Sequence, residues 1–174
     1  MSQENPMSII ERSGYRFSVE HEPDYDHIAP WEDYDGHGLI SNWTTRDKAP
    51  GERVLVTDGR LCRYYDFAGT LALAQKDEWG CPHSAKHTTH RQEIACAVEA
   101  DFEYLRRWCH DEWWYVGVVV TLLDDDDNLT NERESLWGIE SDADNYLDEV
   151  ADELADQIVS RLEVENPDVQ LSEN

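Results

Sequence analysis

WWYVGVVV, residues 113–120, is the longest apolar run of the chain, and only Gly117 interrupts it. Valine, tyrosine and tryptophan favour extended backbone, so this run and the following TLL predict a strand over 113–123. The unbroken valine centre at 118–120 is typical of a strand that is buried on both faces. No other segment of the sequence gives as strong a strand signal.

Weaker strand signals lie on both sides of this run. Polar residues at 124–128 predict a turn, and residues 135–139 predict a returning strand. Far upstream, residues 15–21 alternate apolar with polar side chains, which is typical of a half-buried strand. A hairpin is predicted at 53–65, where an Asp-Gly pair can supply the positive φ angles of a type I′ turn.

Three segments predict helices. The first covers 67–78, and the second covers 91–110 with apolar side chains at three- and four-residue steps. The third opens at 141–144, which resembles a capping box, and reaches about residue 162. Residues 22–52 show no periodicity and predict a long irregular loop.

This order of elements predicts an α+β fold, a mostly antiparallel sheet with about three helices packed on it. A chain of 174 residues has the size of one domain, or at most of two small ones. We therefore expect a single α+β domain over 1–174. It includes the irregular loop 22–52 and a highly acidic hairpin turn and helix at 121–163.

Acidic residues dominate the composition. The chain has 39 Asp and Glu against 14 Lys and Arg, a net charge of −25. Residues 121–174 hold 18 acids and 2 bases, or −16, and residues 1–120 hold the remaining −9. Aromatic residues make up 10% of the chain, which is too many for a disordered acidic tail. A folded protein with an acidic exterior is expected.

Targeting signals are not recognisable in the sequence. No apolar stretch approaches the roughly 18 residues that span a bilayer, and the first residues lack the basic and apolar parts of a signal peptide. We therefore expect a cytosolic protein that makes no membrane contact. In that reducing compartment free thiols are expected at Cys62, Cys81, Cys96 and Cys109.

The last predicted helix carries carboxylates around its apolar stripe. Carboxylates three or four residues apart on a helix lie about 5–6 Å apart and repel one another by a few tenths of a kcal/mol. Phosphates of one DNA strand are about 6–7 Å apart, given a rise of about 3.4 Å per base, so the helix approximates their spacing. The alternative is a solvated face that only confers solubility. The expected partner-binding set is Asp124, Asp125, Asp126, Asp127, Asp144, Asp148, Glu149, Asp152 and Asp156.

One loop gathers residues that could bind a metal. Zinc takes cysteine and histidine ligands in tetrahedral sites, and Cys81, His83, His87 and His90 stand close together in the sequence. Their spacing matches no standard zinc finger. They are therefore weak candidates, and we expect no metal and no cofactor.

Enzyme motifs are absent from the sequence, so we expect no catalytic residues and no enzyme. Two alternatives stay open. Histidines and aspartates of 21–37 could form a carboxylate–histidine site in a small metal-dependent enzyme or accessory protein. Trp31, Tyr34 and Trp43 could anchor a partner or cover the core beneath the irregular loop. The tryptophan-rich run 108–114 could support a homodimer.

Three longer runs are distinctive: YYDFAGTLALAQKDEWG (64–80), AVEADFEYLRRWCHDEWWYVGVVVTLLD (97–124) and SLWGIESDADNYLDEVADELA (135–155). Together with DKAPGERVL (47–55), they resemble small acidic proteins of unassigned function encoded by bacteriophages, prophages and mobile elements. This resemblance implies an origin and carries over no site residues. In charge and size the chain is also similar to phage inhibitors of host defence that mimic DNA.

These features together predict a phage-type inhibitor of a bacterial defence system, either a CRISPR complex or a restriction nuclease. Its partner would be a basic nucleic-acid-binding protein or complex in the cytoplasm of the bacterial host, bound by acidic DNA mimicry. The chain itself would bind no nucleic acid. The alternative inhibitor uses the aromatic loop without mimicry, and its affinity would depend little on salt.

Overall fold

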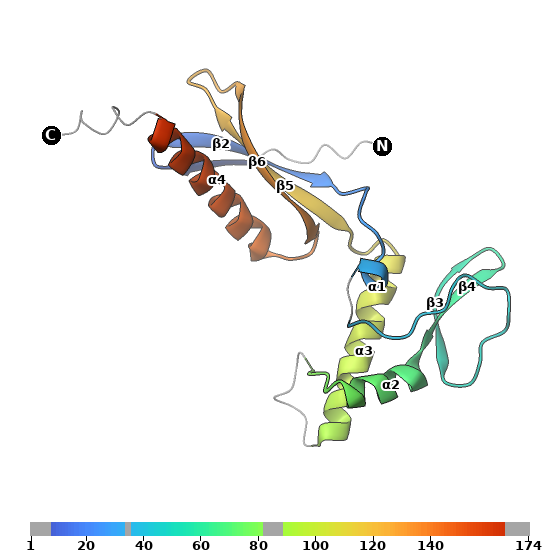
Figure 1. Cartoon of the computed structure of the whole chain (residues 1–174). Coiled ribbons are helices and arrows are strands. Elements are labelled where there is room, and N and C mark those ends of the chain that lie inside the picture. Colours follow the sequence, from blue (N-terminus) through green and yellow to red (C-terminus); the bar gives the residue numbers. More distant parts are fainter. Residues whose placement is uncertain (1–7, 34–35, 82–88, 166–174) are drawn as a thin grey trace. The chain divides into compact units, whose positions relative to one another are not determined.

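The computed structural model describes residues 8–33, 36–81 and 89–165 of the 174-residue chain. Contacts divide the chain into two compact units, where the sequence led us to expect one domain (Figure 1). Unit 1 consists of residues 1–27 and 114–174. Unit 2 is the intervening segment 28–113.

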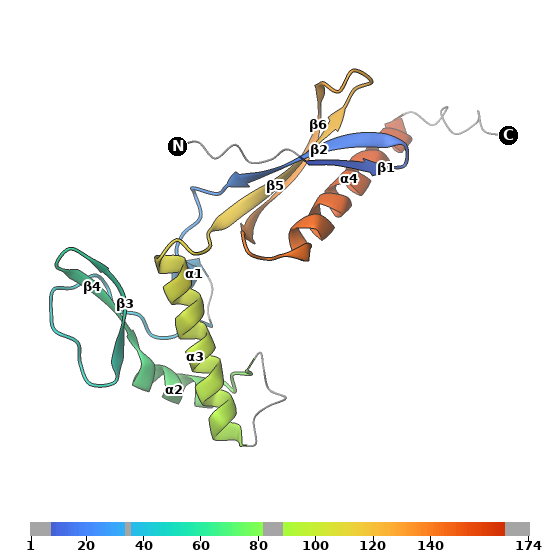
Figure 2. The same ribbon diagram turned by 180° about the vertical axis from the view of Figure 1, so that it is seen from behind.

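Unit 1 is a four-stranded antiparallel sheet with a helix across one face (Figures 1 and 2). The strand order is β1-β2-β5-β6, so β5 is an inner strand. The long helix α4 contacts all four strands. The elements are β1 (Ser8–Arg12), β2 (Tyr15–Pro23), β5 (Tyr115–Leu123), β6 (Leu129–Glu140) and α4 (Asn145–Glu165).

The core of unit 1 lies between the sheet and α4. Successive side chains of a strand alternate between faces, so Val116, Val118 and Val120 share one face and pack against the apolar stripe of α4. Val119 on the opposite face is also buried, at 3% exposure. The ring of Trp137 covers Gly117, where a Cβ atom would overlap it. The predicted burial of this strand on both faces is confirmed.

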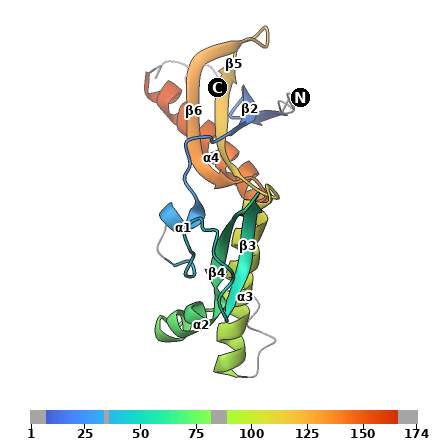
Figure 3. The same ribbon diagram turned by 90° about the vertical axis from the view of Figure 1, so that its right-hand side faces the viewer.

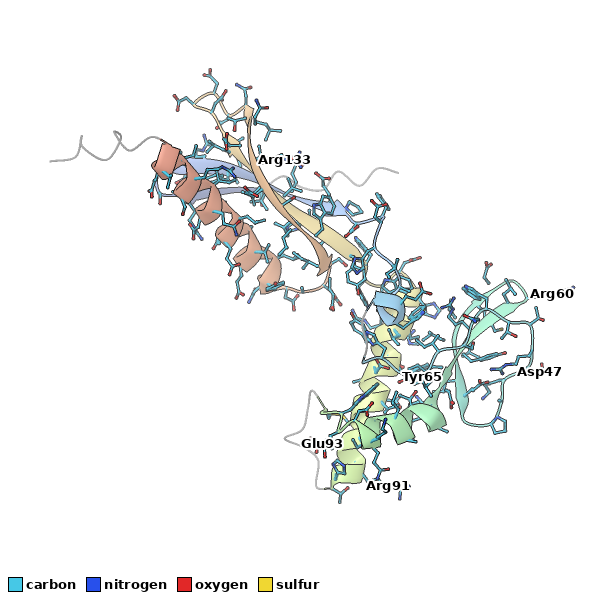
Figure 4. The ribbon with its side chains drawn as sticks, viewed as in Figure 1. Asp47, Arg60, Tyr65, Arg91, Glu93 and Arg133 are labelled. Atoms are coloured by element: carbon cyan, nitrogen blue, oxygen red, sulfur yellow. A yellow bond between two sulfur atoms is a disulfide. The ribbon has the colours of Figure 1, made fainter. Side chains whose placement is uncertain are left out.

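Unit 2 combines a hairpin with helices (Figure 3). The strands β3 and β4 pair with each other, and β3 contacts α3. Tyr65 of β4, labelled in Figure 4, is fully buried and packs on Phe102 of α3. The elements are α1 (Pro30–Asp33), β3 (Glu52–Asp58), β4 (Leu61–Asp66), α2 (Phe67–Lys76) and α3 (His90–Cys109).

The α+β class and the mostly antiparallel sheet are confirmed, although the strands form two sheets. The hairpin at 53–65 is confirmed as well, but the predicted turn type is wrong. Asp58 pairs with Leu61, so the loop is Gly59 and Arg60, and only Gly59 has a positive φ, at 57°. A type I′ turn needs two positive φ angles, and a glycine at the first loop position fits type II′.

Two further expectations need correction. The hydroxyl of Ser141 accepts a hydrogen bond from the Trp114 N–H at 3.0 Å instead of capping α4, which begins at Asn145. Cys81 and Cys96 form a disulfide bond, with Cα atoms 5.6 Å apart, where we expected free thiols. Cys62 and Cys109 are free, as expected.

Candidate functional site

Negative charge is concentrated in unit 1. Residues 1–27 and 114–174 contain 24 acids and 4 bases, a net charge of −20, whereas residues 28–113 contain 15 acids and 10 bases, a net charge of −5. The sequence alone suggested a boundary near residue 120. In the structure, the N-terminal strands and their acidic residues belong to the same unit as the acidic hairpin and helix.

Carboxylates form two rows along α4. A helix turns about 100° per residue, so Asp148, Asp152 and Asp156 line up at four-residue steps, about 6 Å apart along the axis. Glu149 and Glu153 form a parallel row. Buried side chains such as Leu154 and Ile158 occupy the opposite side of the helix. One flank of α4 is therefore acidic, and it turns away from the core.

Arg12 of β1 is the counter-ion of this flank. It forms an ion pair with Asp152, and its Nε lies 3.8 Å from Oδ1 of Asp156. The side chains of Asp152 and Asp156 are still 44% and 65% exposed. Exposed ion pairs contribute only about 0–1 kcal/mol, so a partner's cation could replace Arg12 at small cost.

Two of the four aspartates at the hairpin tip bind other groups of the protein. One oxygen of Asp124 accepts from the backbone N–H of Asn128 at 2.8 Å and of Asp126 at 2.9 Å. The backbone hydrogen bond from Asn128 has the largest effect on the pKa of Asp124, and the side-chain hydrogen bond from Asn128 acts in the same direction. Both hold this pKa below its usual value. Asp127, with a φ of 64°, pairs with Arg16 of β2. Asp125 and Asp126 stay exposed at the tip.

The nine predicted contact residues thus fall into two groups. Asp124, Asp127, Asp152 and Asp156 bind other parts of unit 1. Within the described ranges, no ion pair involves the five others, all of which are exposed: Asp125, Asp126, Asp144, Asp148 and Glu149.

The two acidic patches lie at different places on unit 1. The hairpin tip projects at the end of the sheet where α4 finishes, and α4 begins toward the other end (Figures 1 and 2). Asp148 stands in the first turn of α4. The structure therefore offers a tip patch and a helix-flank patch on one unit, where the sequence predicted a single contact set.

The sequence left open a carboxylate–histidine site within 21–37, and the structure pairs one of these histidines with a residue outside that segment. His27 lies 3.8 Å from Asp24, but His37 pairs with Asp101 of α3, Nδ1 to Oδ1 at 2.6 Å. Asp101 also accepts hydrogen bonds from Gly38 N–H at 2.9 Å and Tyr65 O–H at 2.7 Å. A carboxylate that binds three donors fixes their positions, which favours a structural role over acid–base chemistry.

Sequence reasoning missed Asp101 because its partners lie 36 to 64 positions away. Its place on the buried side of α3, next to the apolar stripe, was the available signal. Burial and the hydrogen bond to Asp101 together raise the pKa of Tyr65 far above its usual value, so its hydroxyl stays a donor.

The weak metal candidates do not assemble among the described residues. Cys81 is bonded to Cys96, so it has no thiolate to offer zinc. His90 begins α3 and is exposed. His83 and His87 lie outside the described residues. In the part of the chain that the structure describes, no three His, Cys, Asp or Glu side chains are grouped to hold a metal ion.

The aromatic candidates are distributed unequally. Trp31 and Trp43 line a pocket with Trp108, whereas Tyr34 lies outside the described residues. In the run 108–114, Trp113 is buried at 1% exposure and Trp114 is 47% exposed. A homodimer built on this run therefore has Trp114 as its main anchor, and it stays a prediction.

No protein-family model, curated protein or solved structure matches this chain. None of the described helices has both the length and the apolar character needed to cross a bilayer.

Proposed function

We propose that the chain is a phage-type inhibitor that covers the basic nucleic-acid-binding surface of a bacterial defence nuclease, a CRISPR complex or a restriction enzyme, in the cytoplasm of the host cell. It acts by blockade and not by catalysis. The observation that carries the proposal is the net charge of −20 on unit 1, against −5 on unit 2.

Electrostatics explains how such a surface would bind. The exposed carboxylates on the flank of α4 meet cationic side chains that otherwise hold phosphates, and counterions leave both surfaces as they do when DNA binds. The tip patch would add a second contact. The like-charge repulsion within α4 falls when basic groups approach, so binding relieves a destabilising interaction of the free protein.

A plating assay tests the inhibitory activity. The chain is expressed in bacteria that carry a defined CRISPR or restriction system, and plating of a phage sensitive to that system is counted. Restored plating supports inhibition, and unchanged plating across systems of both classes contradicts it.

Salt tests the electrostatic mechanism separately. Inhibition of DNA cleavage by the purified nuclease is measured at about 50 mM and about 200 mM salt, a range over which six to ten phosphate-like contacts lose about 10³–10⁵ in affinity. Inhibition that is insensitive to salt would contradict DNA mimicry as the mechanism. The chain would still be an inhibitor, and an aromatic contact would explain its binding.

A further inference from the structure

Unit 2 contains a pocket of about 210 Å³ with aromatic walls. Trp31 from α1, Trp43 from the irregular loop and Trp108 from the end of α3 line it. The rings of Trp31 and Trp108 meet edge to face, with centroids 5.2 Å apart. Val56, which lies next to a β-bulge in β3, also lines the pocket.

Arg63 of β4 is the one base in this lining. Its guanidinium carbon lies 5.0 Å from the ring centroid of Trp31 and 5.2 Å from that of Trp43. These cation–π contacts hold the group in place. The described residues offer it no hydrogen bond or ion pair, and its buried Nε has no acceptor.

Arg63 is half-buried without an acceptor in a chain that has 39 acidic residues, whereas the described arginines Arg60, Arg91 and Arg133, which also lack an ion pair, are exposed. Arg46, Arg53 and Arg161 each pair with a glutamate. Buried hydrogen-bonding groups almost always have a partner, so an arginine fixed between two tryptophans without an acceptor indicates a site for an external anion.

We propose that this pocket binds a small carboxylic acid with an apolar body, whose carboxylate is held by Arg63 and whose body contacts the tryptophan rings. The planar guanidinium fork matches a carboxylate with two parallel hydrogen bonds. The volume is below the roughly 300–1,000 Å³ of pockets for drug-sized ligands, so the body is small.

The remaining lining selects the charge of the ligand. Glu32 is the one acid that lines the pocket, and it is exposed. Its charge disfavours a second negative charge, and therefore a monocarboxylate is preferred to a phosphate. Burial raises the pKa of Cys109 to about 11, against the opposite influence of Arg63, so this thiol is neutral and adds no competing anion.

Phenylacetate is the probe, and 2-phenylethanol has the same body without the charge. Each is titrated into the full chain while tryptophan fluorescence and saturation-transfer NMR are recorded. We expect phenylacetate to bind about tenfold more tightly than the alcohol, with a dissociation constant in the millimolar range for so small a ligand. Equal binding of the two probes, or no binding of either, would overturn the proposal.

Variants assign the site. Arg63→Gln should weaken phenylacetate binding about tenfold and leave 2-phenylethanol binding unchanged. Undiminished phenylacetate binding would contradict the proposal. Because loss of Arg63 could disturb the packing of the tryptophans, Glu32→Gln gives a second test on an exposed residue. It should tighten phenylacetate binding about twofold through lost repulsion, and weaker binding would count against the assignment.

Discussion

Nδ1 of His37 lies 2.6 Å from Oδ1 of Asp101, across 64 positions of the sequence. The other oxygen of this carboxylate accepts from the Gly38 N–H and the Tyr65 hydroxyl. The Asp101 side chain is only 10% exposed. One residue of α3 therefore positions both a part of the irregular loop and the end of β4.

Asp101→Asn should lower the free energy of unfolding by about 1.5–3 kcal/mol, because a charged acceptor with three buried donors is replaced by a neutral amide. Urea unfolding followed by tryptophan fluorescence measures the change. Glu99→Gln on the same helix is the control, since the Glu99–Arg53 pair is exposed and should contribute at most about 1 kcal/mol. Equal losses for the two variants would contradict the structural role of Asp101.

Gly38→Ala should destabilise unit 2 as well. A Cβ atom at this position would overlap the hydroxyl end of Tyr65, and Tyr65 is fully buried and bound to Asp101, so it has no room to move. Overpacking of this kind costs about 1–3 kcal/mol. Gly80→Ala is the matched control, because a Cβ there meets no atom within 4 Å. Thermal unfolding of both variants, followed by circular dichroism, compares them.

Neutralisation of exposed carboxylates in unit 1 should weaken inhibition without loss of stability. The variant combines Asp125→Asn, Asp126→Asn, Asp148→Asn and Glu149→Gln, and we expect at least about tenfold more protein to be needed for half-inhibition of cleavage. Its unfolding temperature should stay the same or rise, because like charges on α4 are removed.

A charge-matched control separates position from total charge. Asp47→Asn, Asp58→Asn, Asp77→Asn and Glu78→Gln remove four exposed carboxylates from unit 2, and Asp47 is labelled in Figure 4. This variant should inhibit like the original chain. If both variants lost activity equally, total charge and not the surface of unit 1 would be responsible.

Asp124 should make the β5–β6 hairpin sensitive to acid. Its pKa is lowered in the folded state, so the stability that it contributes is fully present above its unfolded pKa of about 3.9. That stability is lost as the pH falls through the lower folded pKa. Amide hydrogen exchange in the hairpin should therefore be faster in Asp124→Asn than in the original chain at neutral pH. The difference should shrink as the pH falls below about 3.9, and Asp125→Asn should show no such difference.

Thiol labelling tests the cysteine assignment. The unfolded chain should react with two equivalents of a thiol reagent without reductant, at Cys62 and Cys109, and with four after reduction. In the folded protein Cys109 should react slowly at pH 8, because its pKa is raised to about 11 and only the thiolate reacts. Peptide mapping identifies the labelled residue. Four equivalents without reductant would exclude the disulfide.

Local signals were sufficient for most elements because caps and periodicity act over a few residues. Asp66 and Thr89, residue types that favour helix N-caps, cap α2 and α3 and accept from Gly69 N–H and Gln92 N–H. The strand β1 was missed, although Ser13 and Gly14, both with positive φ, form a turn after it. Five residues are too few for alternation to stand out.

Partners distant in sequence could not be predicted. The acidic pattern identified the surface chemistry, but only the fold shows that Arg12 meets Asp152 and that Asp127 meets Arg16. The disulfide and the pair of His37 with Asp101 are likewise made by segments that tertiary packing brings together. Composition alone does not determine such choices, since each acid has several bases that it could meet.

The insertion of unit 2 between two paired strands has a consequence for the order of folding. Asp24 N–H donates to the Tyr115 carbonyl at 2.9 Å, so the chain leaves the sheet and returns to it at adjacent points. Closing a flexible loop made of residues 28–113 costs about 4 kcal/mol in entropy. A unit 2 that collapses first replaces this loop by a compact body and lowers that cost. A destabilising substitution in unit 2 should then delay assembly of the four-stranded sheet of unit 1, although every strand of that sheet is unchanged.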